Sequence, residues 1–443
     1  MLDMQGFQEP APRKCAASGS RAGEHSSAAS LHWLRCIPSR QAAVLLVLGV
    51  TWPGVNGSVA QTLIQSSLPT MPVRLIHTDQ AVLDLGEPKQ DLPCMVTPIK
   101  PVLDFDMKFH AGYNVTVPLR ELAVARNELT VIFRVRAEDG HDEPSYFQQQ
   151  WQVPPLDEDA KGDVRLQGNF ASGEGRFHVD WLMRDHDDRF CSDYWDFKAF
   201  LTPADRQMRL ALAPATVQAE ESETFQPEPP ITSSAPATGP GSDLKILIHV
   251  AALHTSSSVF QPADTQTLAS TLRAIAREPA FRRFSLVAFD LHNLRVIYRQ
   301  DYADHIDFPA LGEALKLLSP GTVNVNALGR GHTETEFLTE LIRQEMLTER
   351  KPDALIFLGP KFGLEKDISR EALAEFGEPR YPVFYISYSL SPQASVWTDA
   401  ISHTVRFFKG FEYTVSHPRD LWFAITQVLS RIDARQASQR AKR

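Results

Sequence analysis

Hydroxyl side chains and a histidine gather directly after one apolar run of the chain. We expect the run Leu244–Leu253 to form a buried strand, and the loop His254–Ser258 (HTSSS) follows it at once. Doubly wound α/β domains bind their ligands at the carboxyl ends of such strands. Hydroxyl oxygens accompanied by carboxylates can ligate a hard cation, and a serine beside a histidine can act as a nucleophile. The candidate binding residues of this loop are His254, Thr255, Ser256 and Ser258.

Nucleophilic catalysis by Ser256 and His254 would need a third group that orients the imidazole, and an oxyanion hole. The sequence contains no Gly-x-Ser-x-Gly elbow, no HExxH, no phosphate-binding Gly-x-x-x-x-Gly-Lys and no paired-cysteine zinc motif. The glycine-rich segment Leu328–His332 fits no nucleotide-binding spacing. We therefore expect no enzymatic activity and no cofactor. A secreted serine hydrolase that uses Ser256 and His254 is the alternative.

Strands and helices alternate from residue 243 to about residue 433, which predicts an α/β domain. The helices are expected to begin at Asp264, near Asp307, after Thr333 and at Ser416. Ala354–Leu358 and Val383–Ser387 are short apolar runs, which are typical of strands that are covered on both faces. The expected strands are Leu244–Leu253, Phe284–Phe289, Leu294–Tyr298, Ala354–Leu358, Val383–Ser387 and Thr404–Phe408.

Residues 70–206 alternate apolar and polar side chains without a helical period, which predicts an antiparallel, immunoglobulin-like β-sandwich. The expected strands are Val102–Phe109, Leu129–Val135, Tyr146–Val153, Gly175–Met183 and Tyr194–Leu201. Residues 213–242 are rich in Pro, Ser, Thr and Glu, which predicts a disordered linker between the two domains. Residues 434–443 are expected to form a basic tail.

Two clusters in the expected sandwich admit a structural and a functional interpretation. Asp185–Asp188 places carboxylates in one turn, where a solvated hairpin tip is favoured over a calcium site. Trp181, Tyr194 and Trp195 lie on neighbouring expected strands, where packing is favoured over a platform for a glycan or peptide.

The order of elements after residue 243 resembles a von Willebrand factor type A domain, abbreviated vWA. The resemblance rests on the hairpin LVAFDLHNLRVIYR (286–299), the segment PALGEALKLLSPGT (309–322) that follows it, and the polar loop into the next helix. It implies a doubly wound, Rossmann-like α/β fold over residues 243–433. Because vWA domains chiefly mediate contacts between proteins, it also implies an interaction module.

The resemblance further implies where a metal site would lie. Cation-binding vWA domains use Asp-x-Ser-x-Ser after the first strand and a second aspartate after the fourth. Here His254 stands at the first acidic position, although Ser256 and Ser258 keep their hydroxyls, and Pro360 stands at the second, followed by Lys361. Hydroxyl groups without a carboxylate hold Mg²⁺ weakly. We therefore expect no bound metal.

The vWA metal site also takes a threonine from another loop. Thr322 and Thr333 are both candidates for it, although Thr333 with Glu336 also forms a helix capping box. The alternative to a metal-free domain is a cation-dependent vWA adhesin with atypical ligands.

An export signal is expected near the amino terminus. Two arginines precede the apolar run Ala42–Val50, and Ser58–Ala60 supplies small residues for cleavage near Ala60. The run is too short to span a bilayer, so we expect no integral membrane span in the mature chain. Residues 1–60 would then be a targeting segment. Because the polar stretch ahead of the run is long, translation is alternatively expected to start near residue 31 or 34.

The net charge indicates which class of partner is excluded, and the cysteine content indicates the redox compartment of the protein. A formal net charge of -9 argues against nucleic acid as the main partner, because phosphate binding needs a basic surface. Cleavage near residue 60 would leave Cys94 and Cys191, an even pair that predicts a disulfide in an oxidising compartment. Two free buried thiols are the alternative.

The sequence therefore predicts an exported, non-enzymatic module for protein–protein interaction or adhesion, with unknown protein partners and without metal. Its contact surface is expected to comprise three loops at the carboxyl ends of the strands: Thr255–Ser258, Asn326–Thr333 and Gly359–Gly363.

Overall fold

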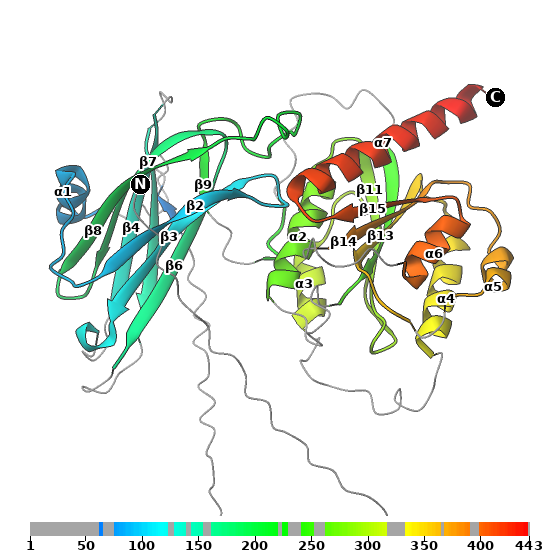
Figure 1. The fold of residues 1–443 in the computed structure, drawn as a ribbon, viewed down its shortest axis with the longest axis horizontal. Helices are drawn as coiled ribbons and strands as arrows, with labels where there is room; N and C mark the ends of the chain where they lie inside the picture. The colour runs from blue at the N-terminus through cyan, green and yellow to red at the C-terminus, as the bar shows by residue number, and fades with distance from the viewer. Residues whose placement is uncertain are drawn as a thin grey trace, which may run out of the picture. The chain divides into compact units, whose positions relative to one another are not determined.

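The computed structural model of the chain is shown in Figure 1. It describes residues 62–64, 75–122, 128–138, 143–153, 161–219, 224–228, 241–251, 262–316, 333–364, 367–389 and 398–441. All of these belong to one compact unit. The expected targeting segment, residues 1–60, lies outside the described residues. Among the described helices, none is both long enough and apolar enough to cross a lipid bilayer.

The amino-terminal part is built from two antiparallel sheets. One has the strand order β1-β5-β4-β7-β8 and the other the order β2-β3-β6-β9. The strands are β1 Thr62–Ile64, β2 Met95–Leu103, β3 Phe109–Pro118, β4 Glu128–Ala137, β5 Ser145–Gln152, β6 Asp163–Ser172, β7 Gly175–Arg184, β8 Phe190–Ala199 and β9 Val217–Ala219. The helix α1 (His77–Leu85) and the short 3₁₀ helix Leu119–Glu121 complete this part.

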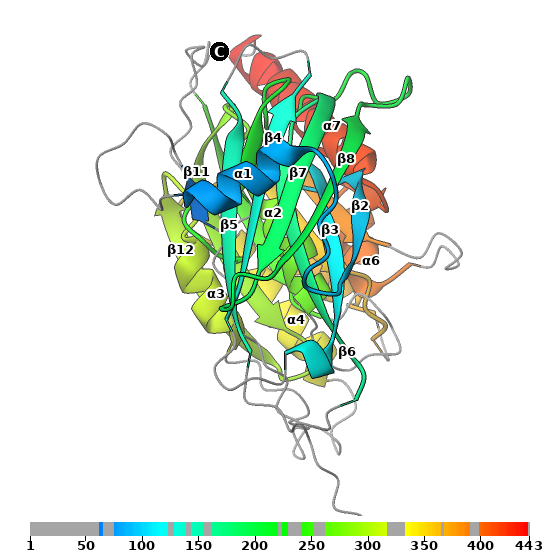
Figure 2. The same cartoon turned by 90° about the vertical axis from the view of Figure 1, so that its left-hand side faces the viewer.

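Aromatic side chains from both sheets form one core. The Tyr113 ring on β3 lies 5.7 Å from Phe133 on β4 and 5.1 Å from Trp181 on β7, between ring centroids. The two sheets therefore pack face to face. On the outer face of the five-stranded sheet, α1 covers Ile132 and Leu182, and Figure 2 shows this helix lying across the strands.

A disulfide joins Cys94, just before β2, to Cys191 on β8, with a Cα–Cα distance of 6.3 Å. It therefore links an edge strand of one sheet to an edge strand of the other.

The prediction of a single strand over Val102–Phe109 is wrong, because the chain reverses between β2 and β3. The Asp106 carboxylate accepts the Lys108 amide at 3.1 Å, and Met107 takes a positive φ of 61°. Asp104 and Asp106 occupy the polar positions of the alternating pattern. The sequence of this tight turn therefore alternates in the same way as that of a half-buried strand, and the pattern does not distinguish the two.

The prediction of a disordered linker over residues 213–242 is wrong for two described pieces. Val217–Ala219 pair with β6 as strand β9. Glu228 forms ion pairs with Arg273 and Arg277 of the α/β part. The Phe225 side chain packs against Gly312 of α3 so closely that a Cβ at this position would clash with it. Residues 229–240 lie outside the described residues.

The carboxyl-terminal part is a six-stranded sheet covered by helices on both faces (Figure 1). The strand order is β12-β11-β10-β13-β14-β15, and all neighbours are parallel except β11 and β12. The strands are β10 Ser242–His249, β11 Phe281–Asp290, β12 Arg295–Ala303, β13 Ala354–Pro360, β14 Val383–Tyr388 and β15 Phe411–Val415. This is the mixed α/β arrangement expected for this part, with the antiparallel strand at one edge.

Alternate residues of the central strands face opposite layers of helices. Leu244, Ile246 and Ile248 share a core with α2 (Pro262–Ala276), α3 (Phe308–Lys316) and α7 (Pro418–Ala441). Leu247 shares the opposite core with α4 (Thr333–Met346), α5 (Arg370–Glu375) and α6 (Ala400–Phe407). Both faces of β10 are thus buried, which explains its nearly uninterrupted apolar sequence.

One prediction near the carboxyl terminus is wrong. The expected strand Thr404–Phe408 lies largely in helix α6, and the last strand is β15. The Asp399 carboxylate caps α6 by accepting the Ser402 amide at 2.7 Å, and Ile401, Val405 and Phe408 face the core at helical spacing. Capping and burial outweigh the strand preference of these residues. The expected basic tail continues α7 as far as Ala441, since it is rich in helix-forming residues.

Candidate functional site

Most of the predicted loop residues lie outside the described part of the chain. These are His254, Thr255, Ser256, Ser258 and Thr322. Thr333 is described as the first residue of α4. Pro360 is the last residue of β13, and Lys361 follows it. The described part of the candidate site is therefore the edge where β10, β11, β13 and β14 end.

Strand β10 ends at His249, five residues before His254. His249 is 3% exposed, and its Nδ1 lies 3.2 Å from the carbonyl oxygen of Pro360 on β13. Gly359 permits this close approach, because a Cβ there would lie 2.5 Å from the His249 carbonyl oxygen. An imidazole thus occupies the crevice between the two strands, at the end of the apolar run.

The surroundings of His249 determine its protonation. Burial lowers the pKa of the imidazole below its usual 6.5, although the Pro360 carbonyl and the charges of Asp399 and Asp290 act in the opposite direction. A carbonyl oxygen can only accept, so Nδ1 must carry the proton of the neutral ring. Nε2 then presents a lone pair, and it has no hydrogen-bond partner among the described residues. His249 is therefore a core residue of which only one ring nitrogen, Nδ1, is hydrogen-bonded within the described residues.

Asp399 is a buried carboxylate at this edge that is fully engaged by protein donors. Its Oδ2 lies 3.0 Å from the Tyr385 hydroxyl and accepts the Phe362 amide at 3.2 Å, while Oδ1 accepts the Ser402 amide. Burial raises the pKa of Tyr385 well above its usual value, so its hydroxyl stays protonated as a donor. Asp399 therefore joins β13, β14 and α6 to one another.

Lys361 is paired, and it does not project freely from the edge. Its Nζ lies 2.7 Å from Glu412 Oε1 on β15, and its side chain is 12% exposed. Glu412 also accepts the Ser402 hydroxyl at 3.0 Å. Asp290, at the end of β11, accepts the backbone amide and side-chain amide of Asn293. Asp290 and Asp399 thus accept protein donors on both carboxylate oxygens. Glu412 accepts a hydrogen bond on Oε1 only, and its Oε2 lies 3.5 Å from Arg406 Nη2 in an ion pair.

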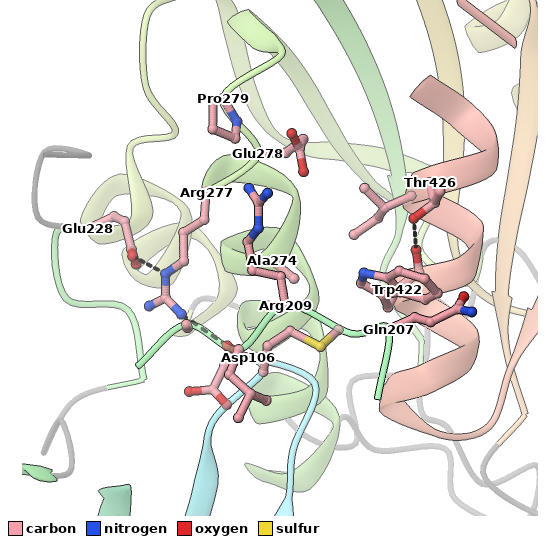
Figure 3. Close-up of a pocket in the computed structure, with 14 residues that line it drawn as sticks. Asp106, Gln207, Arg209, Glu228, Ala274, Arg277, Glu278, Pro279, Trp422 and Thr426 are labelled. Atoms are coloured by element: carbon pink, nitrogen blue, oxygen red, sulfur yellow. Dashed lines mark hydrogen bonds and ion pairs between the residues drawn. The ribbon is translucent and has the colours of Figure 1, made fainter. Parts of the chain in front are cut away.

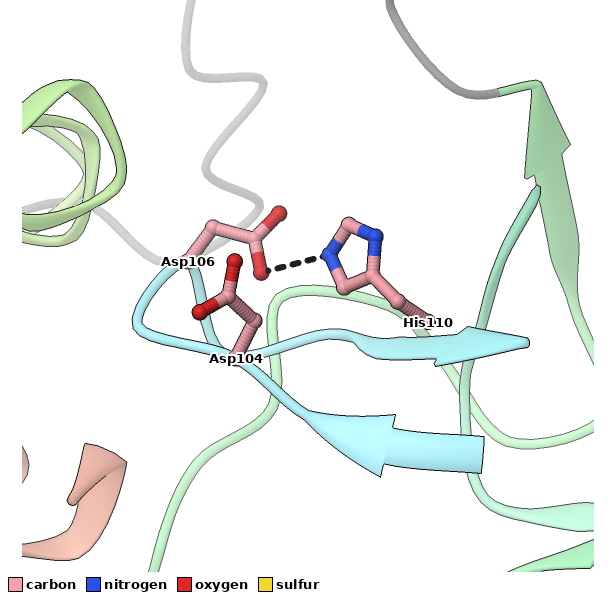
Figure 4. A group of neighbouring side chains, drawn as sticks. All are labelled: Asp104, Asp106 and His110. Atoms are coloured by element: carbon pink, nitrogen blue, oxygen red, sulfur yellow. Dashed lines mark hydrogen bonds and ion pairs between the residues drawn. The ribbon is translucent and has the colours of Figure 1, made fainter. Parts of the chain in front are cut away.

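Two groups of potential metal ligands occur in the described residues, and both lie in the amino-terminal part. Figure 4 shows the first, Asp104, Asp106 and His110, at the β2–β3 turn. Burial alone would raise the pKa of Asp106, but the His110 hydrogen bond and the charges of His110, Lys108 and Arg277 outweigh it and lower the pKa. Basic side chains already compensate this carboxylate, so the group does not require a cation.

The second group is Asp185, His186 and Asp187. The Asp185 carboxylate accepts the amides of Asp187 and Arg189, both at 3.0 Å, and lies 2.7 Å from Arg189 Nε. These bonds organise the β7–β8 turn, which favours the structural interpretation over a calcium site. The aromatic residue Trp181 is fully buried in the sandwich core, so it contributes to packing and not to a surface platform.

Comparison with known proteins identifies no family. No family model matches the sequence, and no curated protein matches it. A structural genomics target named SoR45 matches 28% of this chain and 95% of its own, at 11% identity and a TM-score of 0.16. The PilB minor pilin from Streptococcus sanguinis matches 70% of this chain and 89% of its own, at 8% identity and a TM-score of 0.28. Similarity this low supports no statement about fold or function.

Proposed function

We propose that the chain is an exported, non-enzymatic protein-interaction module whose α/β part is a vWA-like domain that works without a metal ion. The observation that carries this proposal is the state of the carboxylates at the carboxyl edge. Asp290, Asp399 and Glu412 each accept bonds from protein donors, and Pro360 stands where the resemblance calls for an acidic ligand. A hard cation would therefore have to displace existing bonds in order to gain a carboxylate.

The strand order supports the vWA resemblance. The order β12-β11-β10-β13-β14-β15 is the doubly wound order 3-2-1-4-5-6, with an antiparallel strand at one edge. In this order the crevice for ligands lies between the ends of β10 and β13, which are joined there by His249 and Pro360.

The described edge presents both apolar and charged side chains to a partner. Phe362 and Leu364 are half-buried against the core below them, and Gly363 between them is exposed. The Lys361–Glu412 pair lies beside them. Apolar side chains flanked by charges are typical of the centre and rim of a protein interface.

The proposal is tested by capturing partners from the envelope and secreted fractions of the source cells on the immobilised chain, once with Mg²⁺ and once with EDTA. A partner retained equally in both buffers is the expected result. A partner lost in EDTA would overturn the metal-free proposal and favour the cation-dependent adhesin.

A variant then tests whether the carboxyl edge makes the contact. Gly363→Arg places a bulky charge on the edge and is expected to weaken capture about tenfold or more, the effect of about 1.4 kcal/mol. The matched control is Leu347→Arg, because Leu347 is 56% exposed and precedes the amino end of β13. Unchanged binding by Gly363→Arg, or an equal loss of binding in both variants, would contradict a contact at the carboxyl edge.

A further inference from the structure

A cavity of about 570 Å³ lies apart from the carboxyl edge (Figure 3). It is bounded by the β2–β3 turn, residues 207–211, Glu228, the end of α2 and the first turns of α7. Its volume is within the range of about 300–1,000 Å³ that is typical of small-molecule sites. None of its charged residues belongs to the surface proposed above for protein contact.

One side of the cavity is apolar. Trp422 and Ile425 of α7 line it together with Met107 and Leu210. Met107 and Ile425 belong to the core of the α/β part, so they are fixed by packing. The Trp422 ring is part-buried and packs against the same core. This wall can therefore receive an apolar or aromatic group without first having to become ordered.

Two of the basic and acidic residues that line the cavity are already committed to each other. Arg277 bonds Glu228 through Nε, and its Nη1 donates to the Asp106 carbonyl at 3.1 Å. Glu228 also bonds Arg273. These contacts make one end of the cavity a rigid structural element. The Asp106 carboxylate, which also lines the cavity, is bonded to His110. Arg209 and Glu278 are therefore the lining charges that remain available to a ligand.

Arg209 and Glu278 face one another without pairing. Figure 3 shows the Arg209 guanidinium directed toward the Glu278 carboxylate, and the two charges interact electrostatically. Among the described residues, however, Arg209 forms no hydrogen bond or ion pair, and the Glu278 carboxylate forms no ion pair. Burial raises the pKa of Glu278 above its usual 4.5, while the Ala280 amide and Arg209 oppose this rise. The carboxylate is thus short of compensating charge.

We propose that this cavity binds a free amino acid with an apolar or aromatic side chain. Arg209 would bind the α-carboxylate, Glu278 the α-ammonium, and the wall of Trp422 and Ile425 the side chain. Glu278 disfavours a simple anion, and Arg209 disfavours a simple cation, so the pair selects a ligand that carries both charges. This site is independent of the proposed protein-binding edge.

Isothermal titration of the full chain with L-phenylalanine tests the site. Phenylacetate, which lacks the ammonium group, and 2-phenylethylamine, which lacks the carboxylate, serve as matched ligands. Saturable binding of phenylalanine is expected, and each analogue is expected to bind at least about tenfold more weakly. Phenylacetate binding as tightly as phenylalanine would overturn the proposal in favour of a plain anion site. The absence of saturable binding by phenylalanine, leucine and tryptophan at millimolar concentration would overturn it outright.

Two variants assign the charges. Arg209→Gln and Glu278→Gln are each expected to weaken phenylalanine binding at least about tenfold, with circular dichroism unchanged. The control is Arg206→Gln, because Arg206 is an exposed arginine of the same segment that does not line the cavity. Wild-type affinity in both cavity variants would contradict the proposal. Partner capture by these variants is expected to be unaffected, so failure of this site is distinguishable from failure of the proposed function.

Discussion

A buried cluster of charged side chains lies between the α/β sheet and one of its helix layers. Lys245 on β10 is 2% exposed, and its Nζ lies 2.8 Å from Glu345 Oε2 on α4. The other oxygen of Glu345 lies 2.6 Å from Nη1 of Arg299, whose side chain is 40% exposed. Three ionised groups thus cross from the sheet to the helix layer. Desolvation of such groups is costly, so the triad depends on complete pairing.

Lys245→Met is expected to destabilise the chain by about 3–5 kcal/mol, because Glu345 keeps a buried charge with one partner removed. The double variant Lys245→Met/Glu345→Leu is expected to recover much of this loss, since Arg299 can turn to water. Urea unfolding of both variants measures the difference.

The surface pair Lys409–Glu378 supplies the control, as both side chains are largely exposed. Lys409→Met is expected to change the free energy of unfolding by less than about 1 kcal/mol. Equal destabilisation of the Lys245 single and double variants would contradict the role assigned to the triad.

At the scale of elements, the sequence pattern predicts the type of most strands and helices, but not where the chain turns. Alternation within 129–201 indicates β4, β5, β7 and β8 correctly. The β2–β3 turn is missed because its aspartates continue the alternation. Helix α6 is missed because its cap, Asp399, and its buried stripe depend on contacts with β13 and β14 that lie far away in the sequence.

The candidate site illustrates the same limit. The apolar run continues to Leu253, whereas β10 ends at His249 and is followed by the buried Val250. Hydrophobicity alone does not locate the end of β10, so the sequence predicts that the site begins at His254. The short run ALIFL predicts a strand that ends at Leu358 and a loop from Gly359, whereas β13 continues to Pro360, because Gly359 and Pro360 still pair with β14. The pairing of Lys361 with Glu412 could not be predicted, since it depends on β15 lying beside β14.

The disulfide acts on the sandwich as a link between elements. Cys94 and Cys191 are separated by 97 residues, and Cys191 is fully buried. The variant Cys94→Ala/Cys191→Ala is expected to lose about 2–4 kcal/mol of stability, because a long loop in the unfolded chain is no longer closed. In urea unfolding with a reductant present, the free energy of unfolding of the wild type is expected to approach that of the variant. A variant as stable as the oxidised wild type would contradict this role.

On the scale of the whole molecule, the β2–β3 turn connects distant parts of the chain. Phe105 and Met107 belong to the same core cluster as the helices α2 and α7. Arg277 of the segment after α2 donates to the Asp106 carbonyl across 171 residues of sequence. The charge of Asp106 is therefore expected to affect the stability of the entire described unit.

The pH dependence of stability tests this connection. Asp106 has a lowered pKa in the folded chain, so its stabilising effect is full above the ordinary value of 3.8 and is lost as pH falls through the lower folded value. Asp106→Asn is expected to be less stable than the wild type at neutral pH, with a gap that closes below about pH 4. The control is Asp187→Asn, whose side chain is 60% exposed. A gap that is constant down to about pH 2 would contradict the assignment.

The strand order has a consequence for how the chain is made. During synthesis the chain emerges from its amino end, so β10 is complete long before β13, its neighbour in the sheet. The backbone bond from Asp243 to the side chain of Asp353 spans 110 residues. During that interval, a strand that is apolar on both faces has an open flank, and open flanks recruit other chains. A holding chaperone would matter most in this interval, and the duration of chain emergence, more than final stability, would set the yield of folded protein.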